Sequence, residues 1–197
     1  FRRSNWFAPV GDEVRSMRER AGLIELSSFA KYEVQGPGTR DWLDRMVANA
    51  IPKGVGRMNL CHLLNPSGSV RSEFTITRLA DSFYGERFFV VGPGAAHDFD
   101  LDFLQKSLPL DGSVFLTDVT TQFGVLVLAG PEARNVLAKI ADGDVSNEGF
   151  KWLTAQELSV GYCPNVRAMR VNFVGSLGWE LHHPIEYQAH LYDALMA

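Results

Sequence analysis

The sequence predicts an α+β fold made of two similar halves, each with a mixed or antiparallel sheet and with helices packed on it. One observation is a repeated segment. GPGTRDWLDRM and GPEARNVLAKI share Gly, Pro, Arg and Leu in the same register, 94 residues apart. A second observation is an absence, since no GxGxxG motif follows an apolar strand pattern. A parallel nucleotide-binding sheet is therefore not expected.

The order of the predicted elements repeats with the same offset. The strand pattern of residues 70–79 is followed 94 residues later by the pattern of residues 164–173, and the amphipathic pattern of residues 95–106 by that of residues 186–196. Because element order and matching letters agree, they indicate an internal duplication. We expect the halves to be residues 1–110 and 111–197.

Periodicity predicts the individual elements. Trp42, Leu43, Met46 and Val47 recur at helical spacing after a Gly-Pro pair. In the first half we expect helices at 13–21, 36–50 and 95–106, and strands at 31–34, 57–64, 70–79 and 87–91. In the second half we expect strands at 123–128 and 164–173 and helices at 130–141 and 186–196.

Composition excludes several classes of function. With 46% hydrophobic and 21% charged residues the chain is typical of a globular protein, and no apolar run approaches the roughly 20 residues that span a bilayer. A net charge of −4 without a basic stripe argues against a nucleic-acid partner. The two cysteines, Cys61 and Cys163, form no CxxC pair, as expected in a reducing compartment. The adjacent His182 and His183 have no metal-site spacing, so we expect no metal.

The stretch VRAMRVNFVGSLGWELHHP, residues 166–184, is the strongest candidate site. It begins with strand alternation, breaks at Gly175 and Gly178, and continues with Glu180 between an aromatic and an aliphatic residue. A carboxylate sheltered in this way can accept two parallel N–H bonds from a planar donor pair, such as the edge of a 2-amino-4-oxopyrimidine ring. The alternative is a solvated carboxylate on a strand edge.

The pattern R-x-x-[YF]-x-G-x-x-G-W-E, from Arg170 to Glu180, resembles the folate-binding segment of the glycine-cleavage aminomethyltransferase family. The resemblance extends along the chain through GLIELSSFAKYEV, ANAIPKGVG and HLLNPSGSV, and within the family it points to the folate-binding half of dimethylglycine and sarcosine dehydrogenases. It implies that tetrahydrofolate binds here, with Glu180 as the pterin ligand and Phe173, Trp179 and Arg170 beside it. It also implies that Glu73, where relatives usually carry aspartate, is the catalytic carboxylate.

The resemblance implies a one-carbon transfer. A flavin domain would oxidise an N-methyl amine to an iminium ion or formaldehyde, and the folate domain would capture that carbon as 5,10-methylenetetrahydrofolate. FAD would belong to an N-terminal part absent from this chain, and the family's small C-terminal barrel is also absent. We therefore expect a fragment, truncated at both ends and inactive alone, from a bacterial cytoplasm or a mitochondrial matrix. The alternative is a non-catalytic folate-binding or regulatory scaffold module, and the oligomeric state stays open.

Several residues have two interpretations. Alternation places Glu73 on one strand face with Arg71, Thr75 and Thr77, which is also what an outward polar row would look like. Departures from the family are Phe173 and Leu60, where tyrosine is common, and Ser176, where glutamate is common. A folate tail carries carboxylates, and the arginines that could bind it are Arg57, Arg78, Arg167 and Arg170.

Overall fold

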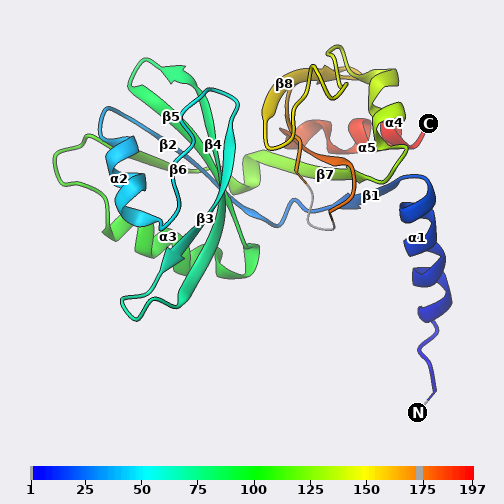
Figure 1. Cartoon of the computed structure of the whole chain (residues 1–197), viewed down its shortest axis with the longest axis horizontal. Helices are drawn as coiled ribbons and strands as arrows, with labels where there is room; N and C mark the ends of the chain where they lie inside the picture. The colour runs from blue at the N-terminus through cyan, green and yellow to red at the C-terminus, as the bar shows by residue number, and fades with distance from the viewer. Residues whose placement is uncertain (1, 172–174) are drawn as a thin grey trace. The chain divides into compact units, whose positions relative to one another are not determined.

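The computed structural model describes residues 2–171 and 175–197 and divides into two compact units (Figure 1). Unit 1 combines the chain up to Leu26 with Gly124–Trp152 and Gln156–Ala197. Unit 2 combines Ser27–Phe123 with Leu153–Ala155.

Unit 2 contains a five-stranded sheet in the order β3-β4-β5-β2-β6, with antiparallel pairing between neighbours. The strands are β2 (Ala30–Gln35), β3 (Met58–Leu64), β4 (Val70–Ser82), β5 (Gly85–Gly92) and β6 (Phe115–Asp118). Helices α2 (Thr39–Met46) and α3 (His97–Lys106) cover one face. Trp42 and Leu43 of α2 and Leu104 of α3 pack there against Phe74 and Ile76 of β4 in the hydrophobic core.

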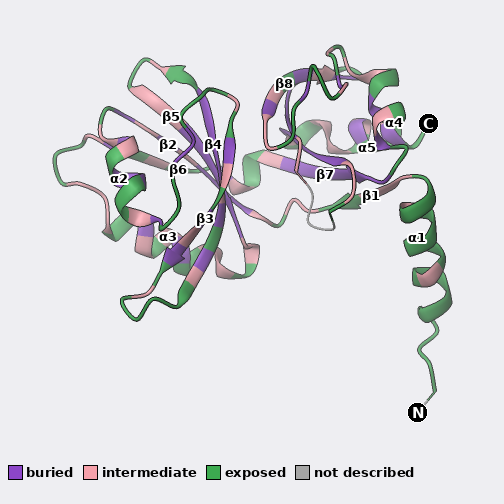
Figure 2. Cartoon of the chain, in the orientation of Figure 1, coloured by how far each residue is buried: buried purple, intermediate pink, exposed green. Residues whose placement is uncertain are grey.

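Unit 1 contains a five-stranded sheet in the order β1-β7-β10-β9-β8. Its strands are β1 (Gly22–Glu25), β7 (Phe123–Ala129), β8 (Ala155–Val160), β9 (Cys163–Met169) and β10 (Gly178–Pro184). Helices α4 (Ala133–Ile140) and α5 (Gln188–Met196) contribute Leu137, Leu191 and Leu195 to its core. Figure 2 shows the buried residues gathered along the central strands of both sheets.

The predicted α+β class with two similar halves is confirmed. Unit 2 follows the order β2-α2-β3-β4-β5-α3, and unit 1 follows the order β7-α4-β8-β9-β10-α5. Corresponding strands also occupy corresponding places in the two sheets, because β3-β4-β5-β2 matches β8-β9-β10-β7.

The edge strands are exchanged between the two repeats. β1 precedes β2 in the chain but pairs with β7, where Gly22 faces Ala129 and Glu25 faces Leu126. β6 precedes β7 in the chain but pairs with β2. The structural units therefore differ from the expected division at 1–110 and 111–197: the first 26 residues join the second half because β1 hydrogen-bonds to β7.

The repeated Gly-Pro pair has a packing reason. Gly36 and Gly130 have φ angles of 130° and 124°, which L side chains rarely adopt. A Cβ on Gly36 would lie 2.3 Å from the backbone oxygen of Ser113, and one on Gly130 would lie 2.6 Å from that of Arg20. In both repeats a glycine thus lets the segment before the exchanged edge strand pass close to the backbone.

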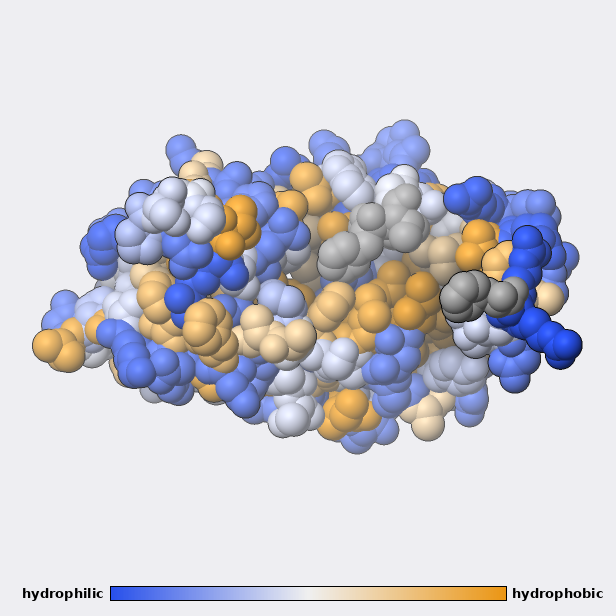
Figure 3. Space-filling view, turned by 90° about the horizontal axis from the view of Figure 1, so that it is seen from below, coloured by the Kyte–Doolittle hydropathy of each residue, from blue (hydrophilic) through white to orange (hydrophobic). Residues whose placement is uncertain are grey.

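Helix α1 (Phe7–Glu19) begins earlier than the expected helix at 13–21. Pro9 lies in its first turn, where the missing N–H would have no intrahelical partner in any case, so proline is tolerated there. No residue of α1 is buried, and large hydrophobic side chains such as Trp6, Phe7 and Val14 are exposed (Figure 2). Other large hydrophobic side chains are exposed on both units, and Figure 3 shows hydrophobic and hydrophilic residues side by side on one face. None of the helices within residues 2–171 and 175–197 is long and apolar enough to cross a membrane.

Candidate functional site

Glu180 lies on β10, between β7 and β9 in the sheet of unit 1, and faces Met169 across the β9 pairing. The residue is only 5% exposed, so the carboxylate is sheltered. Its chain neighbours Trp179 and Leu181 do not provide this shelter, since they belong to the hydrophobic core beneath α4 and α5. Successive strand residues point to opposite faces, which places Glu180 on the face opposite these helices.

A histidine shares this face with Glu180. The Nε2 atom of His182 lies 3.2 Å from Oε2 of Glu180, and His182 is fully buried. His182 faces Arg167 across the β9 pairing, and Arg167 lies 3.6 Å from the carboxylate of Glu157. Among the described residues the second oxygen of Glu180, Oε1, has no hydrogen-bond partner. The carboxylate is therefore anchored on one side and able to accept a ligand N–H on the other.

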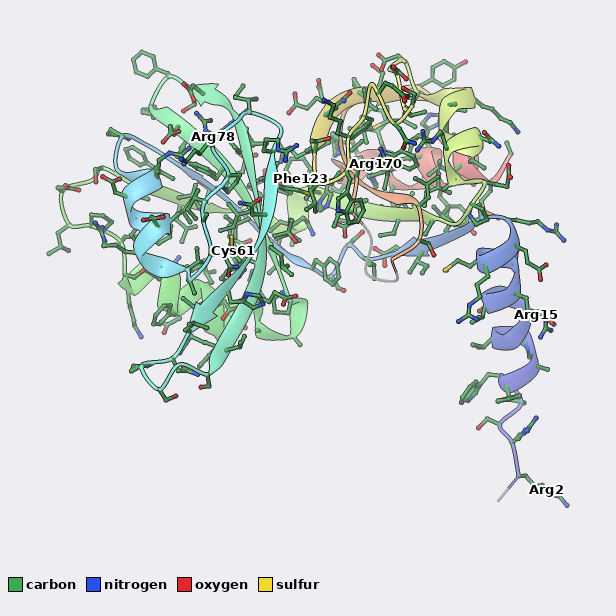
Figure 4. All side chains as sticks on the ribbon, in the orientation of Figure 1. Arg2, Arg15, Cys61, Arg78, Phe123 and Arg170 are labelled. Atoms are coloured by element: carbon green, nitrogen blue, oxygen red, sulfur yellow. The ribbon has the colours of Figure 1, made fainter. Side chains whose placement is uncertain are left out.

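Trp179 and Arg170 lie elsewhere. The ring of Trp179 packs edge-on against Phe150 at 6.1 Å, inside the core of unit 1. The guanidinium group of Arg170 lies 5.8 Å from the same indole ring and donates hydrogen bonds to the Phe150 carbonyl and to Oδ1 of Asn147 (Figure 4). The structure therefore does not bring Trp179 and Arg170 onto the face of Glu180. Phe173, the other predicted ligand residue, lies outside the described residues.

The side-chain amide of Asn147 has a second arginine partner besides Arg170. Arg134 donates to Oδ1 of Asn147 at 2.7 Å, and Arg170 donates to it at 2.6 Å. Burial, together with the charge of Arg134, lowers the pKa of Arg170. Among the described residues the Nε1 atom of Trp179 is buried without a hydrogen-bond partner. These contacts give Arg170 a role in packing the loop that carries Asn147.

Glu73 lies on β4 of unit 2, on the face opposite α2 and α3, and its side chain is 47% exposed. It faces His62 of β3 directly across the strand pair. Oε2 of Glu73 lies 2.9 Å from Nε2 of His62. The other ring nitrogen of His62 lies 3.1 Å from Oδ1 of Asn49. Glu73 is thus part of a three-residue polar chain on the surface of unit 2.

Arg71 departs from the expected alternation. The β3–β4 register shifts so that Leu63 faces Ser72 and Leu64 faces Val70, which leaves Arg71 as an extra residue. Its guanidinium lies 3.9 Å from the ring centre of Phe99, on α3, in a cation–π contact. The bulge therefore removes Arg71 from the face on which Glu73 lies.

Two of the arginines considered for a folate tail already have acidic partners. Arg78 is held by Glu86, by Asp81 and by the carbonyl of Leu79, and only 6% of its side chain is exposed (Figure 4). Arg167 is paired with Glu157. Each of these ion pairs joins neighbouring parts of one unit, which is a structural role.

Both cysteines are buried and are not joined in a disulfide. Burial raises the pKa of Cys61 and of Cys163 to about 11, so both thiols stay protonated near neutral pH. Within the described ranges no three His, Cys, Asp or Glu side chains form a group that could hold a metal ion.

Sequence reasoning missed His62, Asn49 and the contact between His182 and Glu180. Spacing of two residues on a strand could have placed Glu180 and His182 on one face. The pairing of His62 with Glu73 depends on a bulge that the composition of the turn does not indicate.

Comparison with known proteins agrees with this fold. The family model of the GCVT N-terminal domain matches residues 1–197. Mitochondrial dimethylglycine dehydrogenase of Mus musculus is 39% identical over all of this chain, and the mitochondrial pyruvate dehydrogenase phosphatase regulatory subunit of Mus musculus is 31% identical over the same extent. The chain spans 22% of the length of each of these relatives.

A solved structure has the same fold. The glycine cleavage system aminomethyltransferase T from Bartonella henselae superposes with a TM-score of 0.79 at 23% identity, over 94% of this chain and 48% of that protein. Together with the family match over every residue, these findings show that the chain belongs to the GCVT N-terminal domain family.

Proposed function

We propose that this chain is the tetrahydrofolate-binding, one-carbon transfer domain of an N-methyl amine dehydrogenase of the dimethylglycine or sarcosine type. Family membership and the similarity to dimethylglycine dehydrogenase support the proposal. The observation that carries it is the buried Glu180 carboxylate, which has one anchored oxygen and one oxygen without a partner among the described residues. A sheltered carboxylate of this kind suits the paired N–H edge of a pterin.

In this proposal His182 and Glu180 act together. His182 contacts Oε2 of Glu180 and fixes the orientation of the carboxylate. Oε1 then accepts an N–H of the pterin, and Oε2 has a second lone pair for the neighbouring N–H. Because Glu180 is 5% exposed, water competes little for these hydrogen bonds. Trp179 and Arg170 would support the strand from the opposite face.

Calorimetric titration of 5-formyltetrahydrofolate tests the binding role. Glu180→Gln keeps the size of the side chain but removes the charge and one acceptor, and we expect it to weaken binding by about 2–4 kcal/mol. Glu157→Gln is the matched control, because Glu157 belongs to the same unit but its side chain is 57% exposed and contacts Arg167. If both variants bind as tightly as the unchanged chain, Glu180 is not the pterin ligand.

The chemical role is assigned to Glu73. A carboxylate can take a proton from the attacking folate nitrogen or stabilise a cationic intermediate. In this proposal a flavin domain outside this chain would oxidise the N-methyl amine and so produce formaldehyde or an iminium ion. This chain covers 22% of the length of dimethylglycine dehydrogenase, which is consistent with a further domain of that kind. The mitochondrial location named for these relatives supports the mitochondrial matrix for a eukaryotic host.

A non-catalytic module is the second candidate. It is favoured by the similarity to a regulatory subunit of pyruvate dehydrogenase phosphatase. Turnover of formaldehyde and tetrahydrofolate, measured above the uncatalysed condensation, separates the two. A catalytic domain accelerates the reaction and loses about 10²–10⁴-fold in Glu73→Gln, the usual range for a positioned acid or base. A folate-binding scaffold binds 5-formyltetrahydrofolate without accelerating it.

A further inference from the structure

We propose that Asn49, His62 and Glu73 form a proton relay, in which His62 exchanges protons with the carboxylate that contacts the substrate. The inference rests on the proposed function and adds two residues to it. His62 and Asn49 are positioning residues here, since they act through Glu73. Three contacts in unit 2 carry the argument.

The first contacts fix the tautomer of His62. The backbone N–H of His62 donates to Oδ1 of Asn49 at 3.1 Å, which requires that the oxygen of the amide, not its NH2 group, point toward β3. The ring nitrogen Nδ1 of His62 lies 3.1 Å from the same oxygen. An oxygen accepts and does not donate, so Nδ1 carries the hydrogen. The backbone bond from Ala48 N–H to the carbonyl of His62, at 2.9 Å, holds the segment with Asn49 against β3.

The remaining contact joins the imidazole to the carboxylate. With the hydrogen on Nδ1, a neutral His62 presents the lone pair of Nε2 to Oε2 of Glu73, 2.9 Å away. Two lone pairs do not make a hydrogen bond, so this contact is satisfied only when one proton lies between the two atoms. A proton held between the two atoms can therefore belong to either group. The side chains of His62 and Glu73 are 31% and 47% exposed, so the pair can also exchange its proton with water.

Glu73 has a second oxygen for the substrate. Among the described residues, Oε1 of Glu73 has no hydrogen-bond partner. The terminal torsion of a glutamate is broad and roughly two-fold, so a half turn of the carboxyl group carries a proton from the substrate side to the His62 side. A proton that binds to either oxygen of Glu73 can thus be passed to His62.

The condensation of formaldehyde with tetrahydrofolate uses such a pair twice. One folate nitrogen adds to formaldehyde, and its hydrogen passes to the new hydroxyl group. The pair then gives a proton to that hydroxyl group, which leaves as water as the C–O bond breaks. The second folate nitrogen forms its bond to the same carbon and returns a proton to the pair. Overall, formaldehyde and tetrahydrofolate give methylenetetrahydrofolate and one water, and no oxidant is needed.

A plain surface ion pair between β3 and β4 would have the same distance. Exposed pairs of this kind contribute about 0–1 kcal/mol to stability and have no effect on chemistry. The experiment must therefore read the ring protons and the pH dependence rather than the stability of the fold.

The first measurement is the ring ¹⁵N spectrum of the histidine-labelled chain. We expect neutral His62 to be the Nδ1–H tautomer, and we expect this preference to fall in Asn49→Ala. The second measurement is the condensation rate as a function of pH. His62→Gln and His62→Arg should lower kcat about 10–10²-fold, leave KM for tetrahydrofolate unchanged and flatten the pH profile. His62→Arg keeps a positive charge beside Glu73 but cannot release a proton. A loss of rate in this variant therefore shows that the exchangeable proton of His62 is needed, and not only its charge.

The matched control is His97→Gln. His97 is another histidine of unit 2 with a carboxylate at each ring nitrogen, namely Asp98 at 2.8 Å and Asp118 at 2.9 Å. Its replacement should leave kcat and the pH profile unchanged. A dominant Nε2–H tautomer of His62, or His62 variants with the unchanged rate and pH profile, would overturn the relay. These rates are measured in the full-length protein that carries this domain. If that protein neither binds 5-formyltetrahydrofolate nor accelerates condensation, the proposed function fails, and the relay fails with it as a catalytic device even if the tautomer is the expected one.

Discussion

Replacing Gly36 with alanine tests the close approach that accompanies the exchanged edge strand of unit 2. Two costs add at this position. The φ angle of 130° is strained for any L side chain, which costs about 1–3 kcal/mol. The new Cβ would also lie 2.3 Å from the backbone oxygen of Ser113, so the backbone must shift, at about 1–3 kcal/mol more. We therefore expect Gly36→Ala to lower the free energy of unfolding by about 2–6 kcal/mol.

Urea unfolding followed by circular dichroism measures this loss, and two controls separate its causes. Gly68 has a φ angle of 84° with nothing within 4 Å of its Cβ position, so Gly68→Ala should show only the backbone cost, about 1 kcal/mol. A Cβ on Gly38 would meet the side-chain oxygen of Ser113 at 2.5 Å, so Ser113→Gly should rescue Gly38→Ala. The same change should not rescue Gly36→Ala, where the obstacle is backbone. Equal losses in Gly36→Ala and Gly68→Ala would refute the close approach.

The free energy of unfolding should depend on pH through two residues, His97 and Asp100. Burial opposes the charge on His97, but hydrogen bonds to Asp98 and Asp118 outweigh burial and raise the pKa of His97. The stabilisation by charged His97 is therefore complete below the pKa of the unfolded state. It is lost as the pH rises through the pKa of the folded state. His97→Gln should therefore cost about 1 kcal/mol of unfolding free energy at pH 5 and less at pH 8, measured by urea titration. Burial raises the pKa of Asp100, against the hydrogen bond from Ser72. Asp100→Asn should accordingly stabilise the chain by about 1 kcal/mol at pH 7, and this gain should shrink as acid protonates Asp100; a gain that grows in acid would contradict the assignment.

The duplication could be predicted from the sequence, whereas the strand exchange could not. Gly36 and Gly130 stand in matching segments, and the elements around them repeat in the expected order. The exchanged strands β1 and β6 are four residues long, which is too short for a periodic signal. Their partners are chosen by long-range pairing, β1 with β7 and β6 with β2, and local sequence carries no information about that choice.

The surroundings of Glu180 were predictable only in part. The sequence places the carboxylate between Trp179 and Leu181, and these neighbours suggested a sheltered site. Strand geometry sends both of them to the opposite face, into the core of unit 1. The residue that does contact Glu180 is His182, two positions along β10. A period-2 argument applied to residues 178–184 would have identified this contact.

The register around Glu73 was beyond sequence reasoning. A four-residue turn at 65–68 would place His62 opposite Arg71. The connection between β3 and β4 instead runs from residue 65 to residue 69, and the bulge at Arg71 adds one more residue to β4. Each change moves the pairing by one position, and together they bring Glu73 opposite His62. Single-residue shifts of this kind decide which side chains meet, yet they leave the hydrophobic pattern almost unchanged.

The two repeats have similar ionic pairs with different chemical capacity. In unit 2 the pair on β3 and β4 is His62 with Glu73, and 94 residues after Glu73 stands Arg167 of β9, paired with Glu157 of β8. Arginine stays protonated at any physiological pH, so the pair in unit 1 can bind charge but cannot pass a proton. Histidine can do both, because its protonation changes within the physiological range.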